Sequence, residues 1–239
     1  MTFTLVARCP RTGMLGIGTA TRAYAAGVRV PFVRANLGAV AIMAIADERL
    51  GPTALRLLEL GYKAPGVIEE LVRADPFPEY RQLAVVDADG YAAARTGAMN
   101  RDWAGHRIGD GYVVLGNAIA GEVVIDAMES AYLADPDEDL EERLLRAVEA
   151  GRDAGGQPGG QRSAALLVFD RKTFSRVDLR VDLHPEPVGE LRRIFDQYRP
   201  AIPYYEERQV DPRVPPLDDW LIQHGAEPAP AVEGRRPAR

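Results

Sequence analysis

The chain has 239 residues, 46% of them hydrophobic, and its 29 Lys and Arg against 35 Asp and Glu give a formal net charge of −6. This composition indicates a globular protein that can bury a large core without disulfides. The acidic balance argues against nucleic acid as a partner, because phosphate binding requires clustered Lys and Arg. The sequence shows neither a signal peptide nor an apolar run long enough to span a membrane, so we expect a cytoplasmic protein without a membrane partner.

Side chains that commonly perform catalysis are scarce. The single Cys9 excludes an internal disulfide and any multi-cysteine metal site. The histidines are too far apart in sequence to predict a local metal site, and no serine lies in a Gly-x-Ser-x-Gly motif. We therefore expect neither a metal nor a cofactor. The complete set of Ser, His and Lys residues is Ser130, Ser163, Ser175, His106, His184, His224, Lys63 and Lys172.

The first third of the chain has the pattern of a β-hairpin, a buried strand and two helices. A turn containing Pro10 and Gly13 separates the first two strands. The third strand is apolar at nearly every position, as expected when both faces of a sheet are covered. The predicted strands span 2–8, 14–21 and 37–46, and the predicted helices span 52–61 and 65–73.

The chain continues to about residue 200 with further strand pairs and longer helices. Asp89 and Gly90 predict a second hairpin turn, and Leu140, Leu144 and Val148 lie on one face of a helix. Strands are predicted at 81–87, 91–95, 111–115, 163–170 and 176–182, helices at 119–133, 138–151 and 187–198, and a Gly-rich loop at 155–160. This order indicates an α+β fold with mainly antiparallel sheets.

The composition changes near residue 200, where Pro and charged residues become frequent. We therefore expect one domain over residues 1–200 and an extension over 201–225 with a short helix at 217–224. The last segment, 226–239, has the composition of a disordered tail.

One catalytic possibility remains at the start of the chain. Methionine aminopeptidase removes Met1 when the next side chain is small, and Thr2 meets that requirement. An N-terminal threonine combines a hydroxyl nucleophile with an α-amine whose ordinary pKa is about 7.7–8.0, so the amine can accept the hydroxyl proton. Equally, Thr2 is compatible with a purely structural role at the start of an edge strand.

Several runs of the sequence resemble a known bacterial family, and the resemblance extends to about residue 200. They are TFTLVAR at 2–8, RQLAVVD at 81–87, WAGHR at 103–107, Gly116-Asn117, SAALLV at 163–168 and RVDLHPEP at 180–187. Together they resemble the family known as domain of unknown function 1028, within the N-terminal nucleophile (Ntn) hydrolase superfamily. The resemblance implies a four-layer αββα sandwich with two mainly antiparallel sheets. It also implies a hydrolase without a cofactor, acting on a small-molecule amide, imine or related carbonyl compound, and a homodimer or higher homo-oligomer.

The same resemblance implies roles for particular residues. Thr2 is the expected nucleophile, assisted by Arg22 and Asn117, and backbone N–H groups near 43–47 are further candidates for stabilising an oxyanion. The residues expected to contact substrate are Thr21, Met43, Asp47, Trp103, His106 and Ser163.

Structural roles are open for several of these residues. Trp103 and His106 fit a buried turn, Asn117 fits the cap of the helix predicted to start near Ile119, and Asp47 fits the cap of the helix at 52–61. The resemblance implies a Gln near position 43 and an Asn at position 47, whereas this chain has Met43 and Asp47 there. Two other functions therefore stay open: a catalytically inactive small-molecule binding protein of the same fold, and a structural subunit of an assembly.

Overall fold

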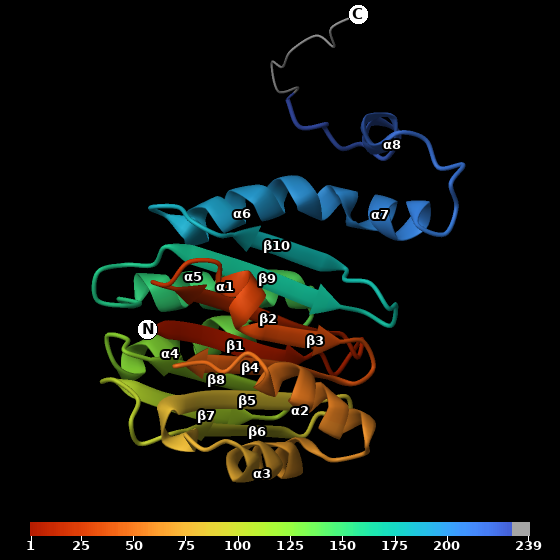
Figure 1. The fold of residues 1–239 in the computed structure, drawn as a ribbon. Helices are drawn as coiled ribbons and strands as arrows, with labels where there is room; N and C mark the ends of the chain where they lie inside the picture. Colours follow the sequence, from red (N-terminus) through yellow and green to blue (C-terminus); the bar gives the residue numbers. More distant parts are fainter. Residues whose placement is uncertain (231–239) are drawn as a thin grey trace, which may run out of the picture. The chain divides into compact units, whose positions relative to one another are not determined.

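Two antiparallel sheets form the centre of residues 1–192 (Figure 1). The computed structural model describes residues 1–230. The larger sheet has the strand order β10-β9-β2-β1-β8-β7 and consists of β1 (Thr2–Arg8), β2 (Leu15–Thr21), β7 (Ala104–Gly109), β8 (Tyr112–Asn117), β9 (Ser163–Phe169) and β10 (Val177–Val181). The smaller sheet has the order β3-β4-β5-β6 and consists of β3 (Pro31–Arg34), β4 (Gly38–Ala44), β5 (Arg81–Asp87) and β6 (Ala92–Thr96).

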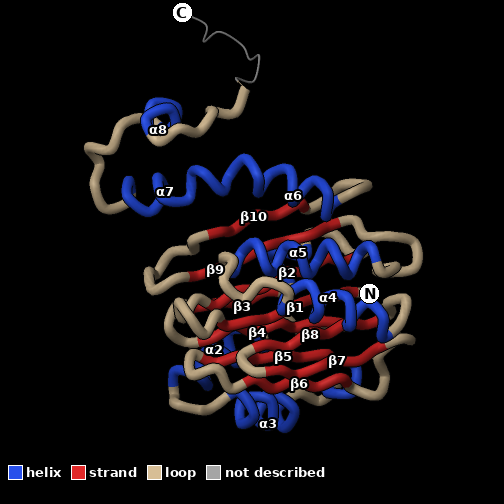
Figure 2. Tube along the Cα trace, turned by 180° about the vertical axis from the view of Figure 1, so that it is seen from behind, coloured by secondary structure: helices blue, strands red, loops and turns tan. Residues whose placement is uncertain are grey.

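Helices cover the outer faces of both sheets (Figures 1 and 2). α4 (Glu122–Leu133) and α5 (Leu140–Asp153) pack against the larger sheet, and α2 (Leu50–Glu59) and α3 (Ala64–Ala74) pack against the smaller one. The predicted αββα sandwich with antiparallel sheets is therefore confirmed. The short α1 (Ala26–Arg29) connects β2 to β3, and α6 (Pro187–Tyr198) follows β10.

The apolar character of β4 has a direct structural explanation. Val40 and Ile42 belong to the core between the smaller sheet and α2 and α3, whereas Ala39, Ala41 and Met43 belong to the core between the two sheets. Successive side chains of a strand point to opposite faces, so a strand covered on both sides needs apolar residues throughout. This confirms the prediction for residues 37–46.

Gly16 and Gly18 allow α5 to lie close to β2. A Cβ atom at Gly18 would lie 2.9 Å from the carbonyl oxygen of Leu144, and one at Gly16 would lie 2.7 Å from the Cδ1 of Leu144. A side chain at Gly18 would require displacement of the helix backbone, and one at Gly16 would require the Leu144 side chain to move. The glycines of β2 thus serve helix packing.

The structure contains two strands that the sequence pattern did not predict. β3 has only four residues and begins at Pro31, and β7 has exposed residues such as His106 and Ile108. Short strands with exposed faces lack the apolar alternation on which strand prediction depends. The helix predicted at 119–133 begins at Glu122, and the strand predicted at 111–115 extends to Asn117.

The described residues from 193 to 230 form a second compact unit, which contains the end of α6. Its described part holds a 3₁₀ turn at Arg199–Ala201, α7 (Ile202–Arg208) and α8 (Leu217–Gln223), of which the sequence predicted α8. Tyr204, Trp220 and Leu221 form its small core. The domain limits at residues 200 and 225 stay a prediction, and residues 231–239 of the predicted tail lie outside the described residues. In residues 1–230, no helix is long and apolar enough to cross a membrane.

Candidate functional site

The candidate site lies where the layer between the two sheets opens at one end. Side chains alternate between the two faces of a strand, and Val6, Ala41, Ala84 and Leu115 belong to the core of this layer. Thr2, Met43, Gln82 and Asn117 lie an even number of positions from these residues on the same strands, so they face the same layer. Thr2 is paired directly with Thr21 on one side and with Asn117 on the other. The strand register therefore brings three predicted site residues together.

Thr2 and Thr21 share a hydrogen bond between their hydroxyl groups. Their Oγ1 atoms are 3.1 Å apart, and Thr21 Oγ1 also donates to the carbonyl of Met1 and accepts from the Ala23 amide. Because a hydroxyl has one hydrogen to donate, Thr2 must be the donor toward Thr21. With Met1 in place, the hydrogen of the Thr2 hydroxyl thus points at Thr21.

The α-amine of Met1 is held by Asn117. It donates to Asn117 Oδ1 over 2.6 Å, while Asn117 Nδ2 donates to Gln82 Oε1 over 2.9 Å. Gln82 is fully buried, and its Nε2 lies within hydrogen-bonding distance of the carbonyls of Gly116 and Gly105. Burial, and secondarily the charge of Arg101, lowers the pKa of this α-amine below its ordinary value.

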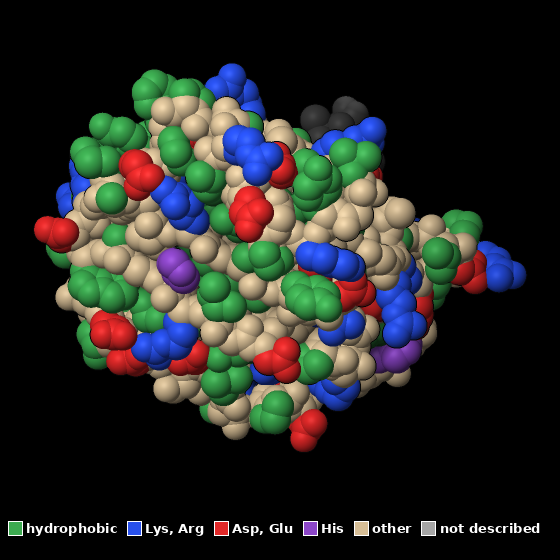
Figure 3. Space-filling view, turned by 90° about the horizontal axis from the view of Figure 1, so that it is seen from below, with side chains coloured by type: hydrophobic (Ala, Val, Ile, Leu, Met, Phe, Trp, Pro, Cys, Tyr) green, Lys and Arg blue, Asp and Glu red, His purple; other side chains and the backbone are tan. Residues whose placement is uncertain are grey.

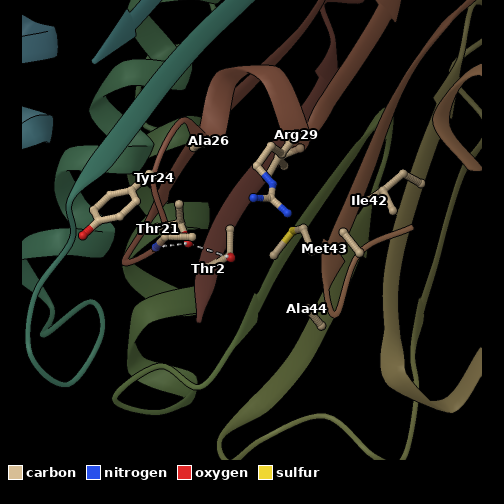
Figure 4. Close-up of a pocket in the computed structure, with 11 residues that line it drawn as sticks. Thr2, Thr21, Tyr24, Ala26, Arg29, Ile42, Met43 and Ala44 are labelled. Carbon is tan, nitrogen blue, oxygen red and sulfur yellow. Dashed lines mark hydrogen bonds between the residues drawn. The ribbon is translucent and has the colours of Figure 1, made fainter. Parts of the chain in front are cut away.

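The Thr2 hydroxyl opens into a pocket of about 120 Å³. Figure 4 shows the Arg29 side chain extending from α1 toward Thr2 and Met43 across this pocket. Arg29 also forms an ion pair with Glu48 at 3.0 Å. The described residues that line the pocket are Thr2, Thr21, Ala23, Tyr24, Ala26, Arg29, Val30, Ile42, Met43, Ala44 and Ala46.

A second pocket of about 380 Å³ lies beyond Met1. Ala44 lines both pockets, and the successive residues Thr2 and Met1 line one each. Ala44 has a φ of 68°, a left-handed conformation that costs a residue with a side chain about 1 kcal/mol or more. The remaining lining residues of the second pocket are Ile45, Tyr80, Met99, Asn100, Arg101 and Asn117.

Two of the predicted site residues hold neighbouring loops in place instead of lining the Thr2 pocket. The guanidinium of Arg22 donates to the carbonyl of Pro158 over 3.2 Å, in the Gly-rich loop. Ser163 is fully buried and binds the Ala23 carbonyl at 2.8 Å and the Ala26 amide at 3.0 Å. Ser163 thereby fixes the segment that forms one wall of the pocket.

Three further predicted residues lie outside the Thr2 pocket. Arg49 donates two side-chain hydrogen bonds to Asp47 and lowers the pKa of that carboxyl to about 2. Trp103 packs over Gly105, where a Cβ would lie 2.6 Å from its ring. His106 accepts or donates a hydrogen bond with Thr96 Oγ1 at 2.8 Å and lines a separate surface hollow.

The structure adds two residues that sequence reasoning missed. Gln82 is a fully buried polar side chain directly before the apolar run at 83–86 of β5, and a buried polar side chain is expected to form hydrogen bonds. Arg29 lies in a segment without a clear periodicity, so nothing in the sequence separated it from the other arginines. Among residues 1–230, no three His, Cys, Asp or Glu side chains are grouped as a metal site would require.

A family model described as "Family of unknown function (DUF1028)" matches residues 2–191. The chain is a DUF1028 protein. A crystal structure of a DUF1028 protein from Silicibacter pomeroyi is 33% identical in sequence, with a TM-score of 0.76 over 82% of this chain and 88% of that one. The resemblance of the sequence runs to this family is thus confirmed over residues 2–191, which include the site.

The present chain also has a more distant match among solved structures, Anbu (ancestral beta-subunit) from Yersinia bercovieri. It is 11% identical, with a TM-score of 0.41 over 90% of this chain and 98% of that one. No sequence among the curated proteins matches the chain.

Proposed function

We propose that this protein is an N-terminal-threonine hydrolase that cleaves an amide, imine or related small carbonyl compound once Met1 has been removed. The observation that carries this proposal is the position of Thr2. Its hydroxyl lines the pocket, and the preceding residue, Met1, engages Asn117 and Thr21. Removal of Met1 would place an α-amine on the residue that carries the hydroxyl.

Loss of Met1 would also release two polar groups beside Thr2. Asn117 Oδ1 would lose the amine that it binds, and the Thr21 hydroxyl would lose the carbonyl to which it donates. Buried polar groups without partners are costly, so both would favour a new ligand. Thr21 would then be able to donate to Thr2 or to substrate, and Asn117 would be able to accept from the new amine.

The proposed reaction requires no group beyond this chain and water. The neutral Thr2 amine takes the proton from Thr2 Oγ1 as that oxygen bonds to the substrate carbonyl carbon. The tetrahedral intermediate collapses with cleavage of the carbon–nitrogen bond, and the ammonium returns the proton to the leaving nitrogen. Water then attacks the ester, with the amine again as base, and releases the acid and the free Thr2 hydroxyl.

Arg29 gives the pocket a fixed positive charge near Thr2. A guanidinium cannot act as a base at neutral pH, but it binds carboxylates through two parallel hydrogen bonds. We therefore assign Arg29 to substrate orientation. Arg22, which the family resemblance placed in catalysis, is assigned to holding the Gly-rich loop through Pro158.

Intact mass of the untagged protein is the first test. The proposal requires a chain that is lighter by one methionine residue, and retention of Met1 in the active preparation would contradict it. Periodate treatment gives an independent readout, because it cleaves a free N-terminal Thr, whose amine and hydroxyl are on adjacent carbons, and leaves an N-terminal Met chain intact.

Turnover over a panel of small amides and imines is the second test. Thr2→Ala is expected to reduce kcat/KM by at least about a thousandfold, whereas Thr2→Ser retains a hydroxyl and measurable turnover. Thr4→Ser is the matched control, because Thr4 is fully buried and bonded to Thr19 at 2.7 Å. Equal turnover by the wild type and Thr2→Ala would exclude Thr2 as the nucleophile. Binding of a panel compound without turnover would favour a non-catalytic binding protein.

A further inference from the structure

A basic pocket lies at the end of the sandwich opposite the start of β1. β1 runs for seven residues from Thr2 to Arg8, which separates the two ends by about 20 Å (Figure 1). The pocket has a volume of about 380 Å³, and its described lining includes Arg8, Arg11 and Arg171, with Asn36 and Thr12. None of the described residues that line it is acidic. It will be called the turn-end pocket.

Hydrogen bonds between turns of both sheets hold the turn-end pocket together. Asn36, between β3 and β4, donates through Nδ2 to the carbonyl of Arg171, between β9 and β10, over 3.1 Å. The amide of Ala88, between β5 and β6, donates to the carbonyl of Leu37 over 3.0 Å. The lining therefore comes from turns that are tied to one another, so the backbone that carries Arg171 is held in place before any ligand arrives.

The three arginines of the turn-end pocket have no carboxylate partner among residues 1–230. Arg11 Nη2 donates to the backbone carbonyls of Asp137 at 2.6 Å and Glu138 at 3.3 Å, which orient the guanidinium without neutralising it. Arg8 Nε is buried and has no hydrogen-bond partner in the described chain. An unpartnered buried donor beside a pocket is an independent sign that a ligand completes the site.

The charges that line this pocket are arranged differently from those on the face in Figure 3. On the face shown in Figure 3, Lys and Arg side chains are interspersed with Asp and Glu. Asp89 is close enough to interact electrostatically with Arg8, but its ion pair is with Lys63. Three guanidinium groups in one pocket repel one another, and a bound anion would relieve this repulsion. Guanidinium groups also present planar pairs of N–H donors that match the oxygens of phosphates and carboxylates.

We propose that the turn-end pocket binds a small polyanion with several oxyanion oxygens. A monovalent ion would neutralise only one of the three arginines, so the pocket favours a ligand of higher charge. Two sources share this chemistry, a polyphosphate group and a small polycarboxylate. The site is separate from Thr2 and does not depend on hydrolysis.

Isothermal titration calorimetry on the full chain tests the proposal, with inorganic pyrophosphate and citrate in separate arms at constant ionic strength. We expect saturable binding of at least one anion, and the tighter of the two identifies the source. Arg171→Gln and Arg11→Gln should each weaken binding about tenfold or more, and Arg171→Lys should weaken it less than Arg171→Gln. Circular dichroism of each variant verifies folding.

Arg213→Gln is the matched control, because it removes the same charge from a side chain that is 88% exposed and lies in the other compact unit. This control should bind as the wild type does. Hydrogen exchange should show that the anion protects the turns at 9–14 and 170–176. The absence of saturable binding, equal weakening by Arg213→Gln, or protection confined to the Thr2 pocket would overturn the proposal.

Discussion

Asn117 Nδ2 donates a hydrogen bond to Gln82 Oε1 over 2.9 Å, and this bond joins the two sheets beside Thr2. It leaves Asn117 Oδ1 directed at the α-amine of the chain, 2.6 Å away. Which atom of the Asn117 amide faces the N-terminus is therefore decided by Gln82, a residue of the opposite sheet. The candidate site is completed by the packing of the sheets and not by one strand alone.

Gln82→Leu is expected to destabilise the protein by about 3 kcal/mol, because it removes the acceptor of Asn117 Nδ2 and the hydrogen bonds to the Gly116 and Gly105 carbonyls. Urea unfolding measures this change. Gln157→Leu is the matched control: Gln157 is also buried, yet its side-chain oxygen and nitrogen have no partner in the described chain. The control should change stability by less than about 1 kcal/mol, and equal losses in both variants would contradict the assigned role of Gln82.

Gly18→Ala should lower the free energy of unfolding by about 1–3 kcal/mol, because the added methyl group meets the Leu144 carbonyl of α5 at 2.9 Å. Gly189→Ala provides the comparison. It lies in α6 with no atom within 4 Å of the added Cβ, and it should stabilise the protein by about 0.5–1 kcal/mol. Thermal or urea unfolding measures both changes. Equal changes in the free energy of unfolding would contradict close packing of α5 on β2.

Arg192→Gln should destabilise the protein by about 2 kcal/mol at neutral pH, because Glu142 is buried and accepts hydrogen bonds from Arg192 and Arg146 at 2.7–3.0 Å. Burial raises the pKa of Glu142, but the bonds from these arginines outweigh it, and the net pKa is lowered from its ordinary 4.5. A lowered pKa in the folded state gives stability that is present above pH 4.5 and is lost as the pH falls through the folded value.

The destabilisation by Arg192→Gln should therefore shrink when urea unfolding is repeated below pH 4.5. Arg73→Gln is the control, since Arg73 is 72% exposed and pairs with Glu70 on the helix surface. It should cost less than about 0.5 kcal/mol at either pH. If the loss of free energy of unfolding caused by Arg192→Gln were the same at both pH values, Arg192 would not be what lowers the pKa of Glu142.

The pH profile of the proposed hydrolysis should have its acidic limb below pH 8. Burial and then Arg101 lower the pKa of the Met1 amine, and Thr2 is more deeply buried than Met1, so the Thr2 amine should be shifted in the same direction. Neutral amine, the form that acts as base, is then present at lower pH. Arg101→Gln removes a charge that lowers the pKa of the amine, so it should move the acidic limb of kcat/KM to higher pH, whereas Arg73→Gln should leave the limb unchanged. A limb at or above pH 8 would argue against this amine as the base.

The two hairpins, the buried strand at 37–46 and most helices were predictable from the sequence because apolar periodicity and turn residues are local signals. The αββα arrangement followed from the family resemblance and is confirmed by the two antiparallel sheets. β3 and β7 escaped prediction because they depend on pairing with neighbours and show little alternation of their own.

At the candidate site, the sequence by itself singled out Thr2, and the family resemblance added Thr21, Met43 and Asn117; the structure brings the four together. Only the tertiary structure decided the rest. Gln82 reaches Asn117 from the other sheet, Arg29 extends into the pocket, and Arg22 binds the Gly-rich loop instead. The physical reason is that a local pattern specifies which face of an element a residue occupies, whereas its partners depend on which elements pack against that face.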